Sequence, residues 1–531
     1  MKRWHVVVMA ILILTALFLA DGGAVYLKEF LSTFQPGATS TQSTTSTRSL
    51  NEPPKAAFMY RTPTRTLKYI APTDQDLIMF LNNSTDPDLP FEALESRWYV
   101  QYNGTGDWQP LNASRDYSTT LPAGQHMIKL IVFDGHSQDS MIQSIVVDRS
   151  DVYPSRQFTI GLKGINYHIG RRYMGEYGRY PDADEINESL DVIRYELGCN
   201  AIKLFGDNPD VMLLAAQKAI EKGFQTIVLS LRYKYAESPS PHREVTIDEH
   251  VKAVIEFSKS AEELRRKYGG IVLCIGEELQ YTVTGLVDAP SYDERINLYW
   301  KLSEEKRAAV NAKLNEYLAT MVKGVREHFL GPVTYSPNEG TRFAVKWREL
   351  DLDIVAPMAY YEAAQWTETN AVKDLLKFKT YGKPVYVTEF GVQCCVGAMA
   401  NASGDPCTYQ KSPIYSQDEQ VHFIDGMVRI FTKARVDGIF YWMFIYKHEN
   451  DAESYGLVKW NGETPATRKL GFYMYKSYAL NQSQEHPSGE TLPFLSASHA
   501  FALWQRNCVM GFTAGVSVNL RVSPRESNPS F

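Results

Sequence analysis

The sequence predicts an α/β fold, a (β/α)8 barrel over residues 151–481, preceded by a smaller all-β domain. Eight apolar segments of strand type alternate with longer segments of helical periodicity from residue 158 onward. In chain order the eight are FTIGLKGINY, NAIKLFG, QTIVLSL, GIVLCIG, PVTYS, DIVAPMAYY, PVYVTEFG and GIFYWMF. They are apolar on both faces, as in a parallel sheet covered by helices. An open doubly wound sheet is less favoured, because no helix starts directly after the first strand.

The segment from 54 to 150 predicts a single β-sandwich. Short strand-type runs such as AAFMY and SRWYVQY are separated by turn residues, and no run has helical periodicity. The segment resembles the PKD (polycystic-kidney-disease-like) domain in its opening PKAAF, in NSTDPD and in IKLIVFDG. In that family the domain is a spacer or adhesion unit, so the resemblance implies no catalysis here.

The first 27 residues predict either a signal peptide or a membrane anchor. Lys2 and Arg3 precede an apolar run that ends at Ala20, and no clear cleavage site follows. Residues 28–53 are rich in Ser and Thr and predict a solvated linker. We therefore expect an extracellular protein, secreted or anchored to the cell surface. Glycosylation sequons fit that location and begin at Asn82, Asn83, Asn103, Asn112, Asn187, Asn401 and Asn481.

Composition excludes two further classes of protein. The chain of 531 residues has 55 basic and 61 acidic side chains and a net charge of −6, with no basic block. This argues against a nucleic-acid partner. A hydrophobic share of 44% excludes a mainly disordered chain. The role of residues 482–531 stays open between a packed appendage and an unstructured tail, since Gln505-Arg506-Asn507 splits its apolar runs.

Six cysteines are too few for a disulfide framework in a chain of this length. Cys394, Cys395 and Cys407 lie close together after the seventh strand, and a bridge between Cys395 and Cys407 is plausible. The alternative, a metal site, lacks a nearby histidine. We expect no metal and no organic cofactor, and we expect the loop 392–415 to form a wall of the cleft.

Two carboxylate positions stand at the ends of predicted strands, where a barrel of this type places its chemistry. The pair Glu277-Glu278 follows the fourth strand, and Glu389 ends the seventh. Glycoside hydrolysis needs two carboxyl groups on either side of one sugar bond. A single glutamate at a rim is more often a helix cap or an ion-pair partner. Two on opposite strands of one barrel favour catalysis.

These motifs resemble the retaining glycoside hydrolases of clan A, such as the family 5 cellulases and mannanases. IGEE resembles the strand-four motif, KPVYVTEFG the strand-seven motif and GIFYW the strand-eight motif. The resemblance implies that Glu278 is the acid/base and Glu389 the nucleophile. The expected substrate-binding residues are Asn166, His168, Lys203, Glu277, Tyr360 and Trp442.

The chain departs from the clan pattern at two positions. Glu277 stands where the clan usually has Asn, and Lys203 where many members have Arg. Asn338-Glu339 also forms an Asn-Glu pair after a strand, but that strand is the fifth, so Glu278 is preferred. Aromatic residues that could line sugar subsites are Tyr281, Trp347, Trp366 and Trp442.

The prediction is an exported retaining β-glycoside hydrolase that cleaves a polysaccharide of β-glucan or β-mannan type by double displacement. A transglycosylase on the same fold is one alternative, because it would use the same carboxylate pair. A non-catalytic carbohydrate-binding or adhesion protein is the other, with Glu277 marking lost activity. The expected partners are the saccharide substrate and, through the N-terminus, a membrane.

Overall fold

The computed structural model describes residues 51–480, except 171–179, 233–244, 403–405, 409, 446–453 and 462–463. The described residues from Pro53 onward form one compact unit. The predicted signal or anchor, nearly all of the Ser/Thr-rich linker and the segment 482–531 lie outside the described residues. None of the helices in the described part of the chain combines the length and apolar character that a membrane span needs.

Two antiparallel sheets form the first part of the described chain. Strands β1 (Phe58–Arg61), β2 (Ile78–Asn82) and β5 (Tyr117–Thr119) pair in the order β1-β2-β5. The second sheet has the order β4-β3-β6-β7, with β3 at Glu95–Gln101, β4 at Gln109–Asn112, β6 at Gly124–Phe133 and β7 at Gln138–Val147. Alternate residues of these strands are buried in one apolar cluster around Trp98, whose ring packs edge-on against Phe58. The PKD-like identity of this segment stays a prediction.

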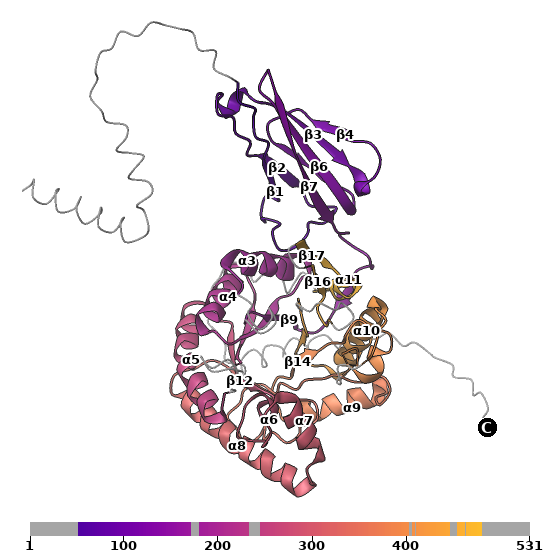
Figure 1. Cartoon of the computed structure of the whole chain (residues 1–531). Coiled ribbons are helices and arrows are strands. Elements are labelled where there is room, and N and C mark those ends of the chain that lie inside the picture. Colours follow the sequence, from indigo (N-terminus) through magenta and orange to yellow (C-terminus); the bar gives the residue numbers. More distant parts are fainter. Residues whose placement is uncertain are drawn as a thin grey trace, which may run out of the picture. The chain divides into compact units, whose positions relative to one another are not determined.

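Seven parallel strands form the central sheet of the second part, in agreement with the predicted barrel (Figure 1). The sheet order is β13-β12-β11-β10-β9-β15-β14. The strands are β9 (Leu162–His168), β10 (Ala201–Gly206), β11 (Thr226–Leu231), β12 (Ile271–Glu277), β13 (Val333–Ser336), β14 (Tyr386–Phe390) and β15 (Gly438–Tyr441). Strands β10 and β12 are buried along their whole length, which explains their continuous apolar sequence.

The predicted sixth strand occupies the gap between β13 and β14 without forming a regular strand. The backbone N–H of Asp353 donates to the carbonyl of Val333, and the N–H of Val355 donates to the carbonyl of Pro384. Isolated parallel bridges join Val355 to Val385 and Met358 to Glu389. Pro357 lacks an N–H, which interrupts the ladder. The barrel is therefore nearly closed, with 353–359 as an irregular eighth member.

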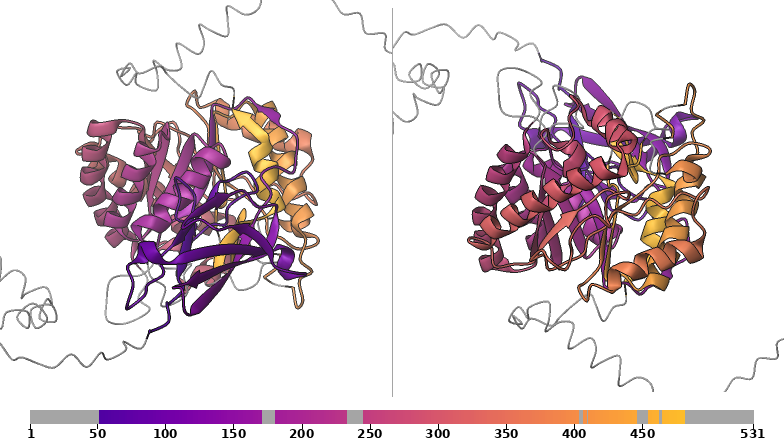
Figure 2. Two further views of the ribbon diagram at one scale, coloured as in Figure 1. Left: turned by 90° about the horizontal axis from the view of Figure 1, so that it is seen from above. Right: turned by 90° about the horizontal axis from the view of Figure 1, so that it is seen from below.

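Helices cover the outside of the parallel strands, as Figures 1 and 2 show. They are α3 (Ala183–Asp191), α4 (Pro209–Glu221), α5 (Ile247–Tyr268), α6 (Leu279–Thr282), α7 (Tyr292–Lys301), α8 (Glu304–Arg326), α9 (Glu368–Lys379), α10 (Gln417–Ala434) and α11 (Leu470–Ser477). The π-helical turn η6 (Val192–Glu196) extends α3, and short pairs β8–β18 (Arg156–Phe158, Tyr478–Leu480) and β16–β17 (Val458–Asn461, Thr464–Arg468) complete this part.

One expected helix is replaced by turns. All residues from 337 to 352, between β13 and the irregular segment, are described, and none is helical. Buried Trp347 and Arg342 fill this side instead, and the indole N–H of Trp347 donates to the carbonyl of Arg342 at 2.9 Å. The turn segment packs as a helix would, so the sheet stays covered.

Candidate active site

Glu389 lies on β14 near the carboxyl end of the barrel and is held by two side chains from other strands. The ammonium Nζ of Lys203, on β10, donates to Oε1 of Glu389 at 2.8 Å. The hydroxyl of Tyr360, just beyond the irregular segment, donates to Oε2 at 3.1 Å. Both carboxylate oxygens therefore have a donor, which fixes the plane of the group.

Lys203 also contacts Glu277, the last residue of β12, so one cation joins two carboxylates. The distance from Nζ to Oε1 of Glu277 is 2.7 Å. The side chains of Lys203 and Glu277 are 0% and 1% exposed. Charges without contact to water are stable only when they are paired. The ion pair with Lys203 therefore compensates the charge of Glu277, the third carboxylate that the sequence places at this rim.

Burial and pairing pull the pKa values of this cluster in opposite directions. Burial raises the pKa of Glu389; Lys203 opposes the rise and Glu277 and Glu278 add to it, and the result is about 7. Burial also raises the pKa of Glu277, but Lys203 and Arg232 outweigh it, so the net pKa is lowered. For Lys203, burial lowers the pKa and the two facing carboxylates more than compensate, so the ammonium stays charged. Glu277 is thus the permanent anion, and Glu389 titrates near neutrality.

Glu278 stands one residue beyond β12 and is aimed by an unusual backbone conformation. Its φ and ψ are 46° and 41°, in the left-handed region that few residues other than glycine adopt. Its Oε1 accepts from Nδ2 of Asn338 at 2.8 Å, and its Oε2 accepts from the hydroxyl of Tyr292 at 2.9 Å. A strained residue with both carboxylate oxygens bonded is typical of a functional site.

Arg232 connects the two halves of the cluster. One terminal nitrogen of its guanidinium lies 3.8 Å from Oε2 of Glu277, and the other lies 3.8 Å from Oε2 of Glu278. Glu278, Arg232, Glu277, Lys203 and Glu389 therefore form one series of alternating charges. The candidate acid/base and the candidate nucleophile stand at its two ends, with side chains 11% and 6% exposed.

Aromatic side chains surround the Glu389 end of this series. Trp442, directly after β15, stacks on Phe205 of β10, with ring centroids 4.8 Å apart. The imidazole ring of His168 also packs against Phe205, with ring centroids 4.7 Å apart. Tyr360 and Tyr455 complete the cluster. This arrangement places flat apolar surface beside the carboxylate, as a sugar ring requires.

Three of the expected substrate-binding residues, Asn166, Lys203 and Glu277, are buried. The amide of Asn166 donates to the carbonyls of Thr388 and Phe440, which ties β9 to its neighbours. In this conformation these three side chains hold the site together. Sugar contact stays a prediction for them, as it does for His168, Tyr360 and Trp442.

The other aromatic candidates are mostly core residues. Tyr281 and Trp347 are fully buried, so the expectation that they line subsites is wrong. Trp366 packs edge-on against Tyr361, with centroids 4.8 Å apart. The decoy Glu339 pairs with Arg342 at 3.3 Å. Burial raises the pKa of Glu339 to about 7 in spite of that arginine.

Sequence patterns do not single out the two side chains that hold Glu278. Asn338 stands in the sequence only as part of the Asn338-Glu339 pair, and Tyr292 belongs to no motif. Each reaches Glu278 across a sequence distance that periodicity does not encode, 60 and 14 residues. The asparagine after the fifth strand was the one available signal.

The loop after β14 is tied by a disulfide between Cys395 and Cys407, with Cα atoms 5.9 Å apart. Cys394 is a buried thiol whose Sγ accepts from Nζ of Lys469 at 3.4 Å. Within the described ranges, no group of three or more His, Cys, Asp or Glu side chains is placed to hold a metal ion.

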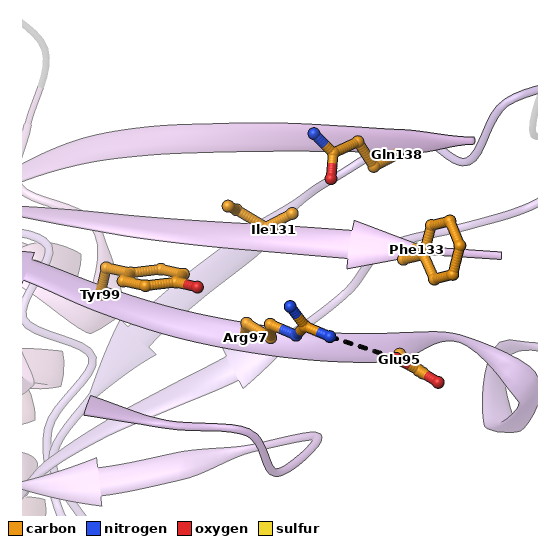
Figure 3. A pocket seen from close by; sticks show the side chains of 6 residues that line it. All are labelled: Glu95, Arg97, Tyr99, Ile131, Phe133 and Gln138. Atoms are coloured by element: carbon orange, nitrogen blue, oxygen red, sulfur yellow. Dashed lines mark ion pairs between the residues drawn. The ribbon is translucent and has the colours of Figure 1, made fainter. Parts of the chain in front are cut away.

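A separate hollow lies on the outward face of the β3-β6-β7 sheet (Figure 3). Its lining residues are Glu95, Arg97, Tyr99, Ile131, Phe133 and Gln138. Arg97 and Glu95 are 3.7 Å apart and are 62% and 66% exposed, so their pairing contributes little. The hollow holds one carboxylate and therefore lacks the pair that glycoside hydrolysis needs.

The barrel with paired carboxylates at its strand ends belongs to the glycoside hydrolase class, and comparison with known families agrees. Residues 303–457 match the sequence model of Glycoside Hydrolase Family 113, a range that includes Tyr360, Glu389 and Trp442. The match makes the chain a glycoside hydrolase of retaining type. The nearly closed parallel barrel agrees with the expected fold, the family model that matches is that of family 113, and the likeness to family 5 stays a prediction.

Solved structures with a similar course of the chain include glycosidases of two kinds. A family 113 β-1,4-mannanase is 15% identical, with 61% of this chain and 99% of that chain covered and a TM-score of 0.39. A family 113 β-mannanase from Alicyclobacillus acidocaldarius is 16% identical, with 60% and 96% covered and a TM-score of 0.38. A β-D-glucuronidase from Dictyoglomus thermophilum is 12% identical, with 80% and 68% covered and a TM-score of 0.39. The comparison with curated proteins found no match by sequence. The class assignment rests on the family match and not on these likenesses.

Proposed function

We propose that the protein is an exported hydrolase that cleaves a β-glucan or β-mannan by double displacement, with Glu389 as nucleophile and Glu278 as acid/base. The observation that carries this proposal is the different environment of the two carboxylates. Glu389 is held by Lys203 and Tyr360 beside the stacked Trp442 and Phe205. Glu278 lies at the opposite end of the charge series. It accepts hydrogen bonds from the neutral side chains of Asn338 and Tyr292, and the Arg232 guanidinium is 3.8 Å away.

In the first step, Oε of Glu389 attacks C1 of the sugar while Glu278 gives its proton to the leaving oxygen. The Lys203 ammonium stabilises the carboxylate before attack, and Tyr360 orients it. In the second step, Glu278 removes a proton from water, which attacks C1 and releases Glu389. Two inversions at C1 leave the anomeric configuration unchanged.

Rescue by azide on an activated aryl β-glycoside separates the two roles. Glu278→Ala is expected to lose about 10²–10⁴-fold on unactivated substrates. Azide restores its turnover and yields a β-glycosyl azide, because the glycosyl enzyme still forms. Glu389→Ala lacks the covalent step, so azide attacks C1 directly and yields the α-glycosyl azide.

Glu339→Ala is the matched control, since it removes another, partly buried glutamate of the same rim. We expect no azide rescue and no glycosyl azide from this variant. If wild-type enzyme releases nothing from a panel of β-glucans and β-mannans, or if the two azide products are exchanged, the assigned roles are wrong. Assay of that panel also identifies the sugar.

Export is supported by the disulfide, because structural disulfides persist in oxidising compartments. The basic pair and apolar run at the N-terminus agree with it. Fractionation of expressing cells, with mass spectrometry of the N-terminal peptide, distinguishes a cleaved signal from an anchor. Recovery of the whole chain in the cytosol would contradict export.

A further inference from the structure

The segment between Glu278 and α8 forms a small structural unit with its own apolar core. Tyr281, Val287 and Tyr299 are buried together in a cluster separate from the main core of the barrel. Buried Arg295 ties α7 to the preceding chain, because its Nε donates to the carbonyl of Tyr281 at 2.6 Å and a terminal nitrogen donates to that of Ala289 at 3.0 Å. Helix α7 is therefore held firmly beside the barrel.

The sequence of α7 explains both its start and its two faces. Ser291 and Glu294 form a capping box, which satisfies free N–H groups of the first turn. Tyr292 and Tyr299 are seven residues apart, so both face the cluster around Tyr281. The side chain of Trp300 projects from α7 about 100° around the helix axis from that of Tyr299, and it is 47% exposed.

Trp300 lies directly against Gly340, in the turn that follows β13. A Cβ atom at Gly340 would stand only 2.1 Å from Cη2 of the indole. The N–H of Gly340 donates to Oδ1 of Asn338 at 3.0 Å, and Nδ2 of Asn338 donates to Glu278 at 2.8 Å. The indole is thus linked through Gly340 and Asn338 to the carboxyl group that we assign as acid/base.

The position of Glu278 defines on which side of the bond Trp300 lies. The acid/base acts on the leaving-group oxygen, so it faces the aglycone part of the substrate. Trp442 and Phe205 lie at the Glu389 end and belong to the other side. Trp300 contacts Gly340, two residues after Asn338, and lies on the same helix as Tyr292, and both Asn338 and Tyr292 bond Glu278. A half-exposed indole there presents apolar surface to the C–H face of a sugar ring.

We propose that Trp300, seated on Gly340, is the platform of an aglycone subsite that binds a sugar unit of the polysaccharide beyond the cleaved bond. The proposal deepens the proposed function and rests on the role of Glu278. Gly340 is required because any side chain at this position would displace the indole. Tyr292 at the start of α7 and Trp300 at its end couple the acid/base to leaving-group recognition.

Paired substrates test the proposal. Mannopentaose and cellopentaose place sugars on both sides of the cleaved bond, whereas 4-nitrophenyl β-mannoside and β-glucoside carry no aglycone sugar. On the pentaose that wild-type enzyme cleaves, we expect Trp300→Ala to reduce kcat/KM roughly 3- to 15-fold. On the matching aryl glycoside, the change should stay within about twofold. The product pattern of the pentaose should shift toward cleavage with fewer sugars on the aglycone side.

Three further variants make the result decisive. Gly340→Ala keeps the indole in the chain but displaces it, so it should reproduce the selective loss, and Trp300→Phe should restore part of the activity. Tyr268→Ala, which removes an exposed aromatic at the end of α5, should change neither substrate.

The outcomes separate this inference from the proposed function. If Glu278→Ala cleaves the pentaose as fast as wild type, the acid/base assignment fails and the subsite with it. If Glu278→Ala is inactive but Trp300→Ala affects both substrates equally, or neither, the subsite alone is overturned.

Discussion

Replacement of Lys203 by methionine tests the electrostatics of the site most directly. Methionine has a similar length and no charge, so Lys203→Met leaves Glu277 and Glu389 buried together without their shared cation. An opposite charge in contact lowers a carboxyl pKa by about 1–3 units. Loss of Lys203 should therefore raise the pKa of Glu389 from about 7 by that amount.

The sign of the effect on activity follows from the role of the group. A nucleophile must be ionised, so activity is lost as pH falls through the pKa of Glu389. In Lys203→Met the loss begins at higher pH. Well below pH 7, kcat/KM should be about 10- to 1000-fold lower than in wild-type enzyme, because each pKa unit corresponds to a tenfold change in ionised fraction.

The assay is the pH profile of kcat/KM on an aryl glycoside with a good leaving group, which makes the acid/base unimportant. Lys163→Met is the matched control: Lys163 is equally buried in the same barrel, but its ammonium donates to the carbonyls of Leu197 and Tyr478. It should lower stability and leave the acidic limb in place. The double variant Lys203→Met/Glu277→Gln removes a neighbouring anion as well. The acidic limb of its pH profile should therefore shift back toward that of the wild-type enzyme. A folded Lys203→Met enzyme with the wild-type acidic limb would refute the reasoning.

Three other changes have defined outcomes. Asn338→Ala removes a donor to the acid/base, so kcat/KM should fall about tenfold or more on phenyl glycosides and far less on dinitrophenyl glycosides, a difference that steady-state kinetics measures. Trp98→Ala empties the centre of the apolar cluster between the first two sheets and should lower the free energy of unfolding by about 3–5 kcal/mol in denaturant titration, without a change in the pH profile. Cys395→Ser opens the 12-residue disulfide loop and should cost about 2–4 kcal/mol. Equal stability of reduced and oxidised wild type would contradict the last of these.

The barrel could be predicted because each of its strands is apolar on both faces and bounded by turn residues. Seven of the eight predicted segments form regular strands. The eighth, around Pro357, lies where expected but lacks the N–H that a regular ladder needs. The helix expected after β13 is absent from the described residues 337–352, because packing of Arg342 and Trp347 satisfies that side of the sheet.

The candidate site was only partly predictable, since motifs report strand ends and not contacts between distant side chains. Glu278 and Glu389 follow directly from the strands that carry them. The departures at Lys203 and Glu277 read as two unrelated changes 74 residues apart in sequence, whereas the structure places their charged atoms 2.7 Å from each other. The burial of both side chains depends on the whole fold.

The separate apolar core beneath α7 has a consequence for how such an enzyme diversifies. Since Tyr281, Val287 and Tyr299 pack among themselves, the unit they support can be remodelled while the parallel strands keep their own packing. Residues on the outward side of that helix are free to vary at little cost to folding. New preferences for the departing sugar can arise there while the reacting carboxylates remain untouched.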